Sequence, residues 1–213
     1  MRNAIIFDLD RTLWDAAERA TGVWNRVLLE HGVSDLKVDQ KTISAVMGKQ
    51  LQEIVKLLLP TLPEEKQQKI LEDYEIAEVA YLRENGAPLY AGVRETLAAL
   101  SRSYDLYIVS NYQDGYIPAF LHAHKLAPYF QDFAMSGKTG LSKGENIKNL
   151  MKKHAIPKAV YVGDTEGDEQ ASREAGIPFI WARYGFRTAQ TPDAVINSFS
   201  ELSACAARFF PPA

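Results

Sequence analysis

Short apolar runs recur along the chain, and each one ends at polar residues. The first run covers 4–7, and later runs cover 106–109 and 159–162. Continuous runs of this length are typical of parallel strands that are buried on both faces. A further strand is expected at 132–135 and a last clear one at 178–182, and helical periodicity separates the runs. This alternation predicts an α/β fold with a doubly wound parallel sheet and right-handed connections.

A helical stretch without strand patterns follows the first strand. Apolar residues recur there at helical spacing in four segments, which we interpret as helices at 15–32, 39–47, 51–59 and 63–84. Gly or Pro residues stand at the expected ends of these segments, where they stop or start helices. We therefore expect an inserted helical domain of residues 15–87 and an α/β domain made of residues 1–14 and 88–213.

Two acidic residues, Asp8 and Asp10, stand at the end of the first apolar run. Ligands of open α/β sheets bind at the carboxyl ends of the strands. A carboxylate in such a place loses solvation unless it meets a metal ion or hydrogen-bond donors. The pair therefore suggests a magnesium site and a carboxylate nucleophile. On this motif alone, two aspartates in an ordinary turn remain an open alternative.

A second acidic strand end lies far downstream. The run 159–162 continues into Gly163 and Asp164, and Asp168 follows one helical turn later. Gly163 allows the backbone to turn sharply without a Cβ clash. Asp168 could instead be an acidic residue that complements the dipole of a helix N-terminus. Two acidic strand ends nevertheless favour a shared site over two unrelated turns.

Further polar and basic residues follow predicted strands in the sequence between the two acidic strand ends. Ser110 and Asn111 end the run 106–109 and offer a hydroxyl group and backbone N–H groups. A Ser-x-x-Glu capping box at 142–145 places Lys143 in the first turn of a helix, where peptide dipoles favour an anion. Ser110 could merely close a turn, and Lys143 could be a solvated surface lysine. Their order at successive strand-to-helix junctions favours a functional explanation.

Together these motifs resemble the haloacid dehalogenase superfamily, in particular its phosphoglycolate phosphatase-like subgroup. The family's four motifs appear in order as Asp-x-Asp-x-Thr at 8–12, Ser110, Lys143 and Gly-Asp-x-x-x-Asp at 163–168. The resemblance covers nearly the whole chain. It implies a Rossmann-like core and makes the helical insertion an α-helical cap over the active site. Lys138 is the alternative to Lys143 for the third motif.

The resemblance also implies roles for the acidic residues. Asp8 would be the nucleophile that forms an aspartyl-phosphate, and Asp10 would be the general acid and then the base that activates water. Mg²⁺ would be bound by the Asp8 carboxylate, the Asp10 backbone carbonyl and Asp164, with Asp168 as a further ligand or as a partner of the ligands.

The phosphoryl group would be bound by Thr12, Ser110, Asn111 and Lys143, of which Lys143 also acts in catalysis. Lys49 follows Gly48 at a turn of the insertion and is a further candidate for gripping an anion. A solvated lysine is its alternative.

Arg11 stands where the family commonly has Gly. A residue at this position can face the substrate entrance, so Arg11 could bias substrate choice toward anions. Its alternative is an ordinary solvated arginine.

We therefore expect a magnesium-dependent phosphatase that hydrolyses a small phosphorylated metabolite. A phosphomutase acting on a sugar phosphate could use the same pair, Asp8 and Asp10, and stays open. A 2-haloacid dehalogenase is disfavoured, because the resembled dehalogenases lack the second aspartate of the first motif. A non-enzymatic phospho-receiver would also carry acids, a hydroxyl and a lysine, but receivers are shorter and have no helical insertion.

Composition excludes several other classes. The 213 residues are 46% hydrophobic and 24% charged, which is ordinary for a globular protein. The net charge of -3 argues against a nucleic-acid-binding surface. The single cysteine, Cys205, excludes an intramolecular disulfide and a cysteine-based zinc site. The apolar run before Asp8 is too short for a signal peptide, and no run is long enough to span a membrane, so we expect a cytoplasmic protein.

Overall fold

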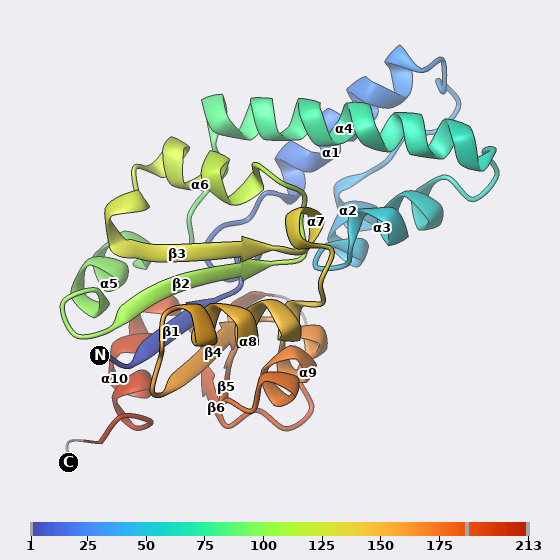
Figure 1. The fold of residues 1–213 in the computed structure, drawn as a ribbon. Coiled ribbons are helices and arrows are strands. Elements are labelled where there is room, and N and C mark those ends of the chain that lie inside the picture. Colours follow the sequence, from blue (N-terminus) through green and yellow to red (C-terminus); the bar gives the residue numbers. More distant parts are fainter. Residues whose placement is uncertain (1, 186–187, 212–213) are drawn as a thin grey trace.

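The computed structural model describes residues 2–185 and 188–211. Within these residues six parallel strands form one sheet in the order β3-β2-β1-β4-β5-β6 (Figure 1). The strands are β1 (Ala4–Phe7), β2 (Asp105–Ser110), β3 (Phe130–Met135), β4 (Ala159–Gly163), β5 (Phe179–Ala182) and β6 (Ala194–Ile196). This order is that of a doubly wound Rossmann-like sheet, which confirms the predicted fold class.

The register of the central strands explains where a ligand can bind. Phe7 of β1 lies opposite Ile108 of β2 and Val162 of β4. The order of strands reverses between β1 and β4, and such a switch point opens a crevice at the carboxyl ends of the strands. Asp8 and Asp164 leave these two neighbouring strands at the same edge of the sheet. Asp8 remains tied to it, because its backbone N–H donates to the carbonyl of Val162 at 2.8 Å.

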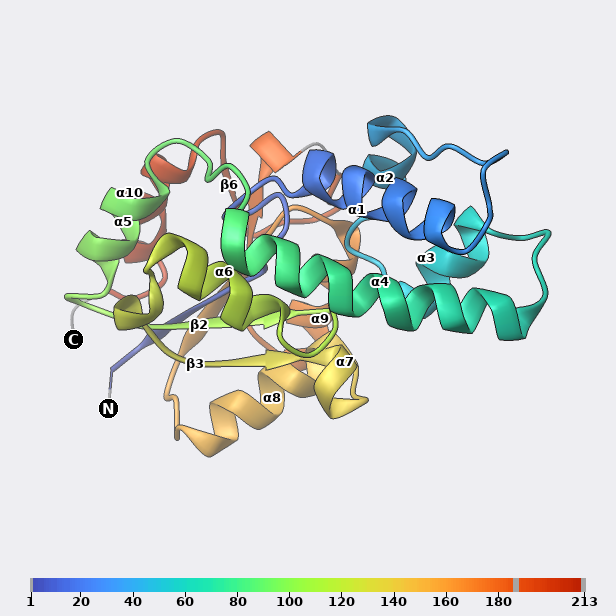
Figure 2. The ribbon, with the colours of Figure 1, turned by 90° about the horizontal axis from the view of Figure 1, so that it is seen from above.

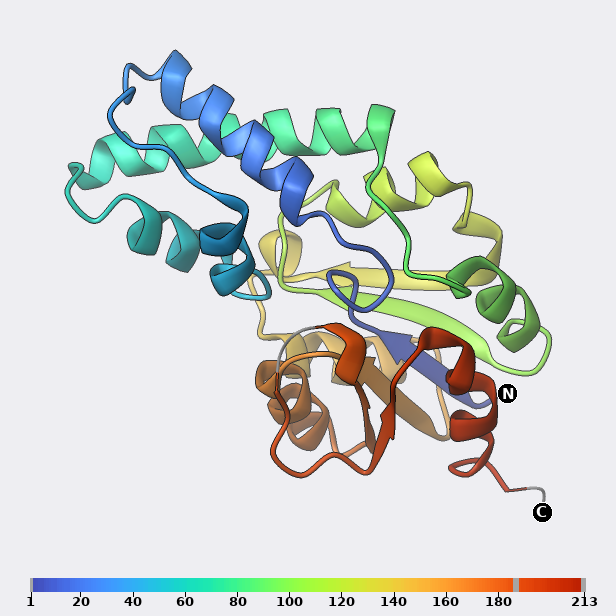
Figure 3. The ribbon, with the colours of Figure 1, turned by 180° about the vertical axis from the view of Figure 1, so that it is seen from behind.

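Helices cover both faces of the sheet, so the strands are buried on both sides. Side chains of β1 alternate between two clusters: Ile5 and Phe7 enter one, and Ala4 and Ile6 enter the other. This two-sided burial is why the strands appear in the sequence as continuous apolar runs. Helices α5 (Val93–Leu100), α6 (Tyr116–His124) and α10 (Leu202–Ala207) cover one face, and α8 (Lys143–Lys153) and α9 (Glu166–Ala175) cover the other (Figures 1 and 3).

The stretch between β1 and α5 is helical, as predicted. Its helices are α1 (Ala17–Glu30), α2 (Gln40–Val46), α3 (Leu51–Leu58) and α4 (Glu64–Asn85). The long helix α4 runs beside both α1 and α6, so the insertion rests directly on the α/β part (Figure 2). Trp24 of α1 and Tyr74 of α4 stack with their ring centroids 3.8 Å apart. On the basis of this arrangement, we propose that residues 15–87 form a cap and that residues 1–14 and 88–213 form the core.

A strand and a short helix were not predicted from the sequence. The strand β6 was missed because a run of three residues carries too little pattern. A short helix, α7 (Ser136–Thr139), follows β3, and its Gly137 donates to the Tyr112 carbonyl at 3.0 Å. Over the described residues, no helix combines the length and the apolar character needed to cross a membrane.

The contact of Gly137 generates a stability prediction. A Cβ at Gly137 would lie 2.5 Å from the backbone Cα of Gln113, so Gly137→Ala must displace backbone. We expect this substitution to lower the free energy of unfolding by about 1–3 kcal/mol in denaturant titrations. Gly22 of α1 is the control, because a Cβ there would meet nothing within 4 Å. Gly22→Ala should stabilise the protein by about 0.5–1 kcal/mol, and equal stabilities for the two variants would contradict the packing described here.

Candidate active site

Three carboxylates meet at the carboxyl edge of the sheet. Asp8 follows β1, Asp164 follows β4, and Asp168 lies in the first turn of α9. One oxygen from each of them lies within 4.8 Å of the others, and all three residues are buried. Residues more than 150 positions apart in the sequence therefore share one small site. Such a cluster is costly to bury unless a positive charge lies among the acids.

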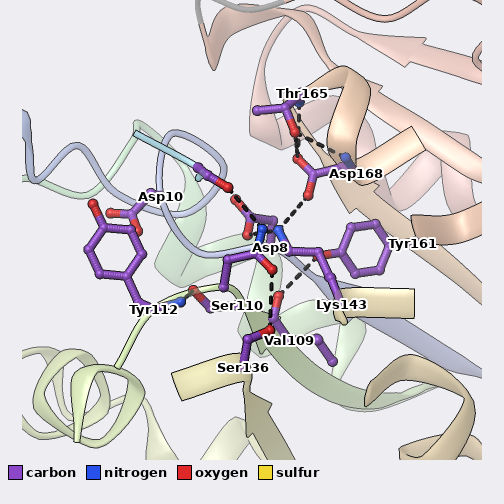
Figure 4. Close-up of polar contacts among 12 residues, drawn as sticks. Asp8, Asp10, Val109, Ser110, Tyr112, Ser136, Lys143, Tyr161, Thr165 and Asp168 are labelled. Carbon is purple, nitrogen blue, oxygen red and sulfur yellow. Dashed lines mark hydrogen bonds and ion pairs between the residues drawn. The ribbon is translucent and has the colours of Figure 1, made fainter. Parts of the chain in front are cut away.

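Lys143 supplies a positive charge to this cluster (Figure 4). Its Nζ donates to Oδ1 of Asp8 at 2.7 Å and to Oδ1 of Asp168 at 2.6 Å, and the lysine is only 6% exposed. The predicted capping box is present, because the Ser142 hydroxyl and the Glu145 carboxylate accept from each other's backbone N–H. The cap starts α8 at Lys143 and directs this side chain toward the strand ends.

Lys138, the other candidate for the lysine motif, lies elsewhere. It belongs to α7, is exposed, and pairs with Asp114 at 3.4 Å. It therefore makes none of the contacts that Lys143 makes with the carboxylate cluster.

The electrostatics of the cluster follow from burial. Burial raises the pKa of Asp8 to about 7, against the opposing effect of Lys143. Burial is also the main cause that raises the pKa of Asp164, and the charges of Asp168 and Asp8 add to it. For Lys143, burial alone would lower the pKa, but the carboxylates of Asp168 and Asp8 outweigh it and keep the pKa above its usual value. The site therefore holds more acidic groups than one lysine neutralises.

Asp168 and Asp164 differ in how their oxygens are used. Oδ2 of Asp168 accepts from the backbone N–H and the hydroxyl of Thr165, at 3.0 and 2.7 Å, in the capping box of α9. Its other oxygen accepts from Lys143, so both are engaged. Oδ2 of Asp164 is buried and has no hydrogen-bond partner among the described residues. Of these two acids, Asp164 is the better placed to bind a cation directly.

Asp10 faces a different environment from Asp8. Its Oδ1 accepts from Nε1 of Trp14 at 3.0 Å and from the hydroxyl of Tyr116 at 2.8 Å. Its side chain is not part of the three-carboxylate cluster. Burial raises the pKa of Asp10 to about 7, while the hydrogen bond from Tyr116 lowers it. The sequence could have indicated Trp14, which lies four residues after Asp10, but nothing marked Tyr116 before the fold was known.

Arg11 lies at the junction of the core and the helical insertion. It adopts a left-handed backbone with a φ of 60°, a conformation that Gly adopts without strain. It is 6% exposed, and its guanidinium donates to the Ser44 hydroxyl of α2 at 2.5 Å. The solvated alternative for Arg11 is therefore wrong, because burial and the bond to Ser44 hold its side chain inside.

The predicted phosphate-binding residues Ser110, at the end of β2, and Asn111, directly after it, carry other bonds. The Ser110 hydroxyl accepts from the backbone N–H of Tyr112 at 3.3 Å, which is a turn-closing contact. The Asn111 amide donates to the carbonyl of Gly48 at 2.9 Å and accepts from the Ser136 hydroxyl at 3.3 Å. Asn111 thus connects the strand end to a turn of the helical insertion.

Thr12 and Lys49 have contrasting surroundings. The Thr12 hydroxyl is buried without a hydrogen-bond partner among the described residues. Lys49 is partly exposed and pairs with Glu53 one helical turn away. It lines a cavity of about 240 Å³ between the insertion turn 47–49 and residues 165–167 of the core. Lys49 therefore sits beside the site rather than among its carboxylates.

Known proteins share this architecture. The family model described as "Haloacid dehalogenase-like hydrolase" matches residues 5–182. A phosphoglycolate phosphatase from Rhodobacter capsulatus is 32% identical over 195 residues, which cover 88% of this chain and 87% of the relative. A solved structure of a predicted phosphoglycolate phosphatase from Haemophilus somnus superposes with a TM-score of 0.82 at 21% identity, covering 96% of this chain and 98% of the other. A putative haloacid dehalogenase-like hydrolase from Bacteroides fragilis gives 0.81 at 22% identity, with 95% and 100% coverage.

The chain belongs to the haloacid dehalogenase-like hydrolase family. Within the family it is similar to the phosphoglycolate phosphatase-like subgroup, as its motifs predicted. The enzyme class that the motifs implied, a phosphoric monoester hydrolase, is confirmed by the same comparisons. The non-enzymatic receiver is thereby excluded.

The environment of Asp10 generates a prediction on stability and pH. The pKa of Asp10 is raised to about 7 in the folded state, which therefore keeps the proton up to that pH, whereas the unfolded chain releases it near the ordinary aspartate pKa of 3.8. As the pH rises between these values, the unfolded state binds fewer protons than the folded state, so stability falls. Asp10→Asn keeps an acceptor for Trp14 and Tyr116 but carries no charge. In the presence of a chelator this variant should be more stable than the wild type, and by more at pH 8 than at pH 5, in urea titrations. A gain that is equal at both pH values would contradict the raised pKa.

Proposed function

We propose that this enzyme hydrolyses a small phosphomonoester in a magnesium-dependent reaction through an aspartyl-phosphate on Asp8. The observation that carries the proposal is the contact of Lys143 with Asp8 and Asp168 in a buried site at the switch point of the sheet. A lysine between carboxylates at this place can stabilise a phosphoryl group next to an acidic nucleophile, which would otherwise repel it.

The first step is phosphoryl transfer to the enzyme. An oxygen of Asp8 attacks phosphorus, and the bond from phosphorus to the substrate's leaving oxygen breaks. Asp10 gives its proton to the leaving oxygen, so an alcohol departs. The pKa of Asp10, raised to about 7 by burial, supports this role, because the group is protonated over a useful range near neutral pH.

The second step returns Asp8 to its free form. Asp10, now a carboxylate, takes a proton from a water molecule as the water oxygen attacks phosphorus. The bond from phosphorus to Asp8 breaks, and inorganic phosphate leaves. Lys143, Ser110, Asn111 and Thr12 are the residues that we assign to the phosphoryl oxygens in both steps.

The residues at the strand ends fit a magnesium ion. Oxygen atoms of Asp8, Asp164 and Asp168 lie within 4.8 Å of one another, and Asp164 has a buried oxygen without a partner among the described residues. Hard oxygen donors suit this ion. We assign Asp8, Asp164 and the backbone carbonyl of Asp10 as ligands and Asp168 as their partner. When bound, the ion supplies positive charge that offsets the acids and the substrate.

The substrate that we propose is a small phosphorylated metabolite, with phosphoglycolate as the first candidate because the relatives are named for it. Arg11 supports an anionic substrate, since its buried guanidinium lies between the core and α2. A phosphomutase would need the phosphoryl group to return to the substrate. Product analysis with sugar phosphates separates this alternative, since a phosphatase releases inorganic phosphate and a mutase yields an isomer.

Release of inorganic phosphate tests the proposal. With Mg²⁺, a panel of phosphorylated metabolites should yield turnover for at least one small phosphomonoester. Asp8→Asn removes the nucleophile at constant size, so we expect a loss of activity of about 10⁴-fold or more with an unchanged circular dichroism spectrum. Lys138→Met, which changes an exposed lysine of α7, is the matched control and should retain activity. Substantial turnover in Asp8→Asn would remove Asp8 from this role.

The metal assignment makes a separate prediction. Removal of divalent cations should abolish turnover, and added Mg²⁺ should restore it. Asp164→Ala should weaken Mg²⁺ binding more than Asp168→Ala, because both oxygens of Asp168 already accept hydrogen bonds. Calorimetric titration of the two variants with Mg²⁺ measures the difference without substrate. Equal or reversed losses would show that Asp164 is not the stronger ligand.

A further inference from the structure

A further buried acid, Glu78, lies outside the site described above. It belongs to α4 of the helical insertion and is 0% exposed. Its Oε1 accepts from the Tyr74 hydroxyl at 2.6 Å, and its Oε2 accepts from the Gln113 side chain at 2.8 Å. Tyr74 is on the same helix, but Gln113 belongs to the core. Glu78 thus connects the insertion to the core through a buried hydrogen bond.

Gln113 lies in the short loop between β2 and α6, and this loop leads to a partner of Asp10. Tyr112 precedes Gln113 and stacks on Tyr116, with ring centroids 4.2 Å apart and an interplanar angle of 25°. Tyr116 starts α6 and donates its hydroxyl to Asp10 at 2.8 Å. A continuous series of contacts therefore runs from Glu78 to the Asp10 carboxyl group.

The loop is packed tightly, so a displacement at one end is transmitted along it. A Cβ at Gly115 would lie 3.0 Å from Val79, the neighbour of Glu78 on α4. On the other side of the loop, a Cβ at Gly137 would lie 2.5 Å from the backbone of Gln113. Close-packed segments of this kind shift as a unit rather than deform locally.

A purely structural role explains Glu78 poorly. A fully buried carboxylate with two neutral donors costs more free energy to desolvate than an apolar side chain of similar size. The bond to Gln113 has a use beyond stability, because the loop begins at Asn111, directly after Ser110 at the end of β2. The position of Glu78 therefore bears on both the general acid and the phosphate-binding residues.

We infer that Glu78 is a positioning residue that acts through Gln113, Tyr112 and Tyr116 to hold the carboxyl group of Asp10 against the leaving oxygen of the substrate. This inference rests on the proposed function, because it assumes that Asp10 is the general acid. It assigns to α4 a part in catalysis that does not require α4 to contact the substrate.

Leaving-group dependence tests the inference. In Glu78→Leu the link to Gln113 is lost and Asp10 is misplaced, so single-turnover phosphorylation by an alkyl phosphate should slow by about tenfold or more. Phosphorylation by 4-nitrophenyl phosphate should slow much less, because its leaving group needs little protonation. Glu78→Gln can keep both hydrogen bonds if the Gln113 amide turns over, so it should recover most of the alkyl phosphate rate.

Glu72 is the matched control, because it is an exposed acid on the same helix. Glu72→Leu and Glu72→Gln should leave both rates unchanged. Gln113→Leu cuts the same link from the core side and should reproduce the selective loss, which keeps the test decisive if Glu78→Leu does not fold. In a Tyr116→Phe background, Glu78→Leu should add less than about twofold, since coupled sites are not additive.

Three results would overturn the inference. Glu78→Leu and Gln113→Leu could slow both substrates equally, they could leave both rates unchanged, or the effects of Glu78→Leu and Tyr116→Phe could multiply. In each of these three cases the wild-type enzyme still turns over both substrates, so the proposed function would remain supported. A wild-type enzyme that releases no phosphate from either substrate would instead overturn the proposed function and this inference with it.

Discussion

The ion pairs of Lys143 with Asp8 and Asp168 are the interaction on which the site depends. Three parts of the chain meet there: the end of β1, the first turn of α8, and the first turn of α9, which follows the end of β4 directly. Burying a lone carboxylate at these strand ends would be costly, and breaking a buried pair costs about 3–5 kcal/mol. The lysine offsets part of the acidic charge, and the acids in turn hold the lysine. Lys143 does not offset all of the acidic charge, and the remaining acidic group, chiefly Asp164, is the one that fits a cation.

Two aspartates one residue apart acquire different chemistry from their surroundings. Asp8 lies among charges, where Lys143 opposes the effect of burial on its pKa. Asp10 lies among aromatic rings, where its partners are the indole of Trp14 and the phenol of Tyr116. Burial raises the pKa of both carboxyl groups to about 7, so the difference lies in their donors: a lysine cation contacts Asp8, whereas neutral indole and phenol groups contact Asp10. Residues two apart in an extended chain point to the same side, so the difference between the two groups comes from the neighbours that the fold supplies.

Much of this arrangement was predictable from the sequence because its signals are local. Apolar runs predicted β1, β2 and β4, and the capping box placed Lys143 at the start of α8. The environment of Asp10 was not predictable, because Tyr116 lies 106 positions away and carries no motif. Glu78 lies on the buried stripe of α4, four residues after Tyr74 and four before Leu82, but this spacing does not identify its partner in the core. Its bond to Gln113 depends on the packing of α4 against the loop before α6, and the sequence of α4 alone does not show that contact.

A covalent phosphoryl group at Asp8 is the central intermediate of the proposed reaction, and chemical trapping detects it directly. Enzyme mixed with Mg²⁺ and excess substrate is quenched in the steady state and treated with sodium borohydride, which reduces an acyl phosphate of aspartate to homoserine. Peptide mass spectrometry then locates the reduced residue. We expect reduction at residue 8 that requires substrate and is absent from Asp8→Asn. Reduction at another carboxylate, or phosphate release with no trapped residue under conditions in which hydrolysis of the intermediate limits turnover, would contradict the account.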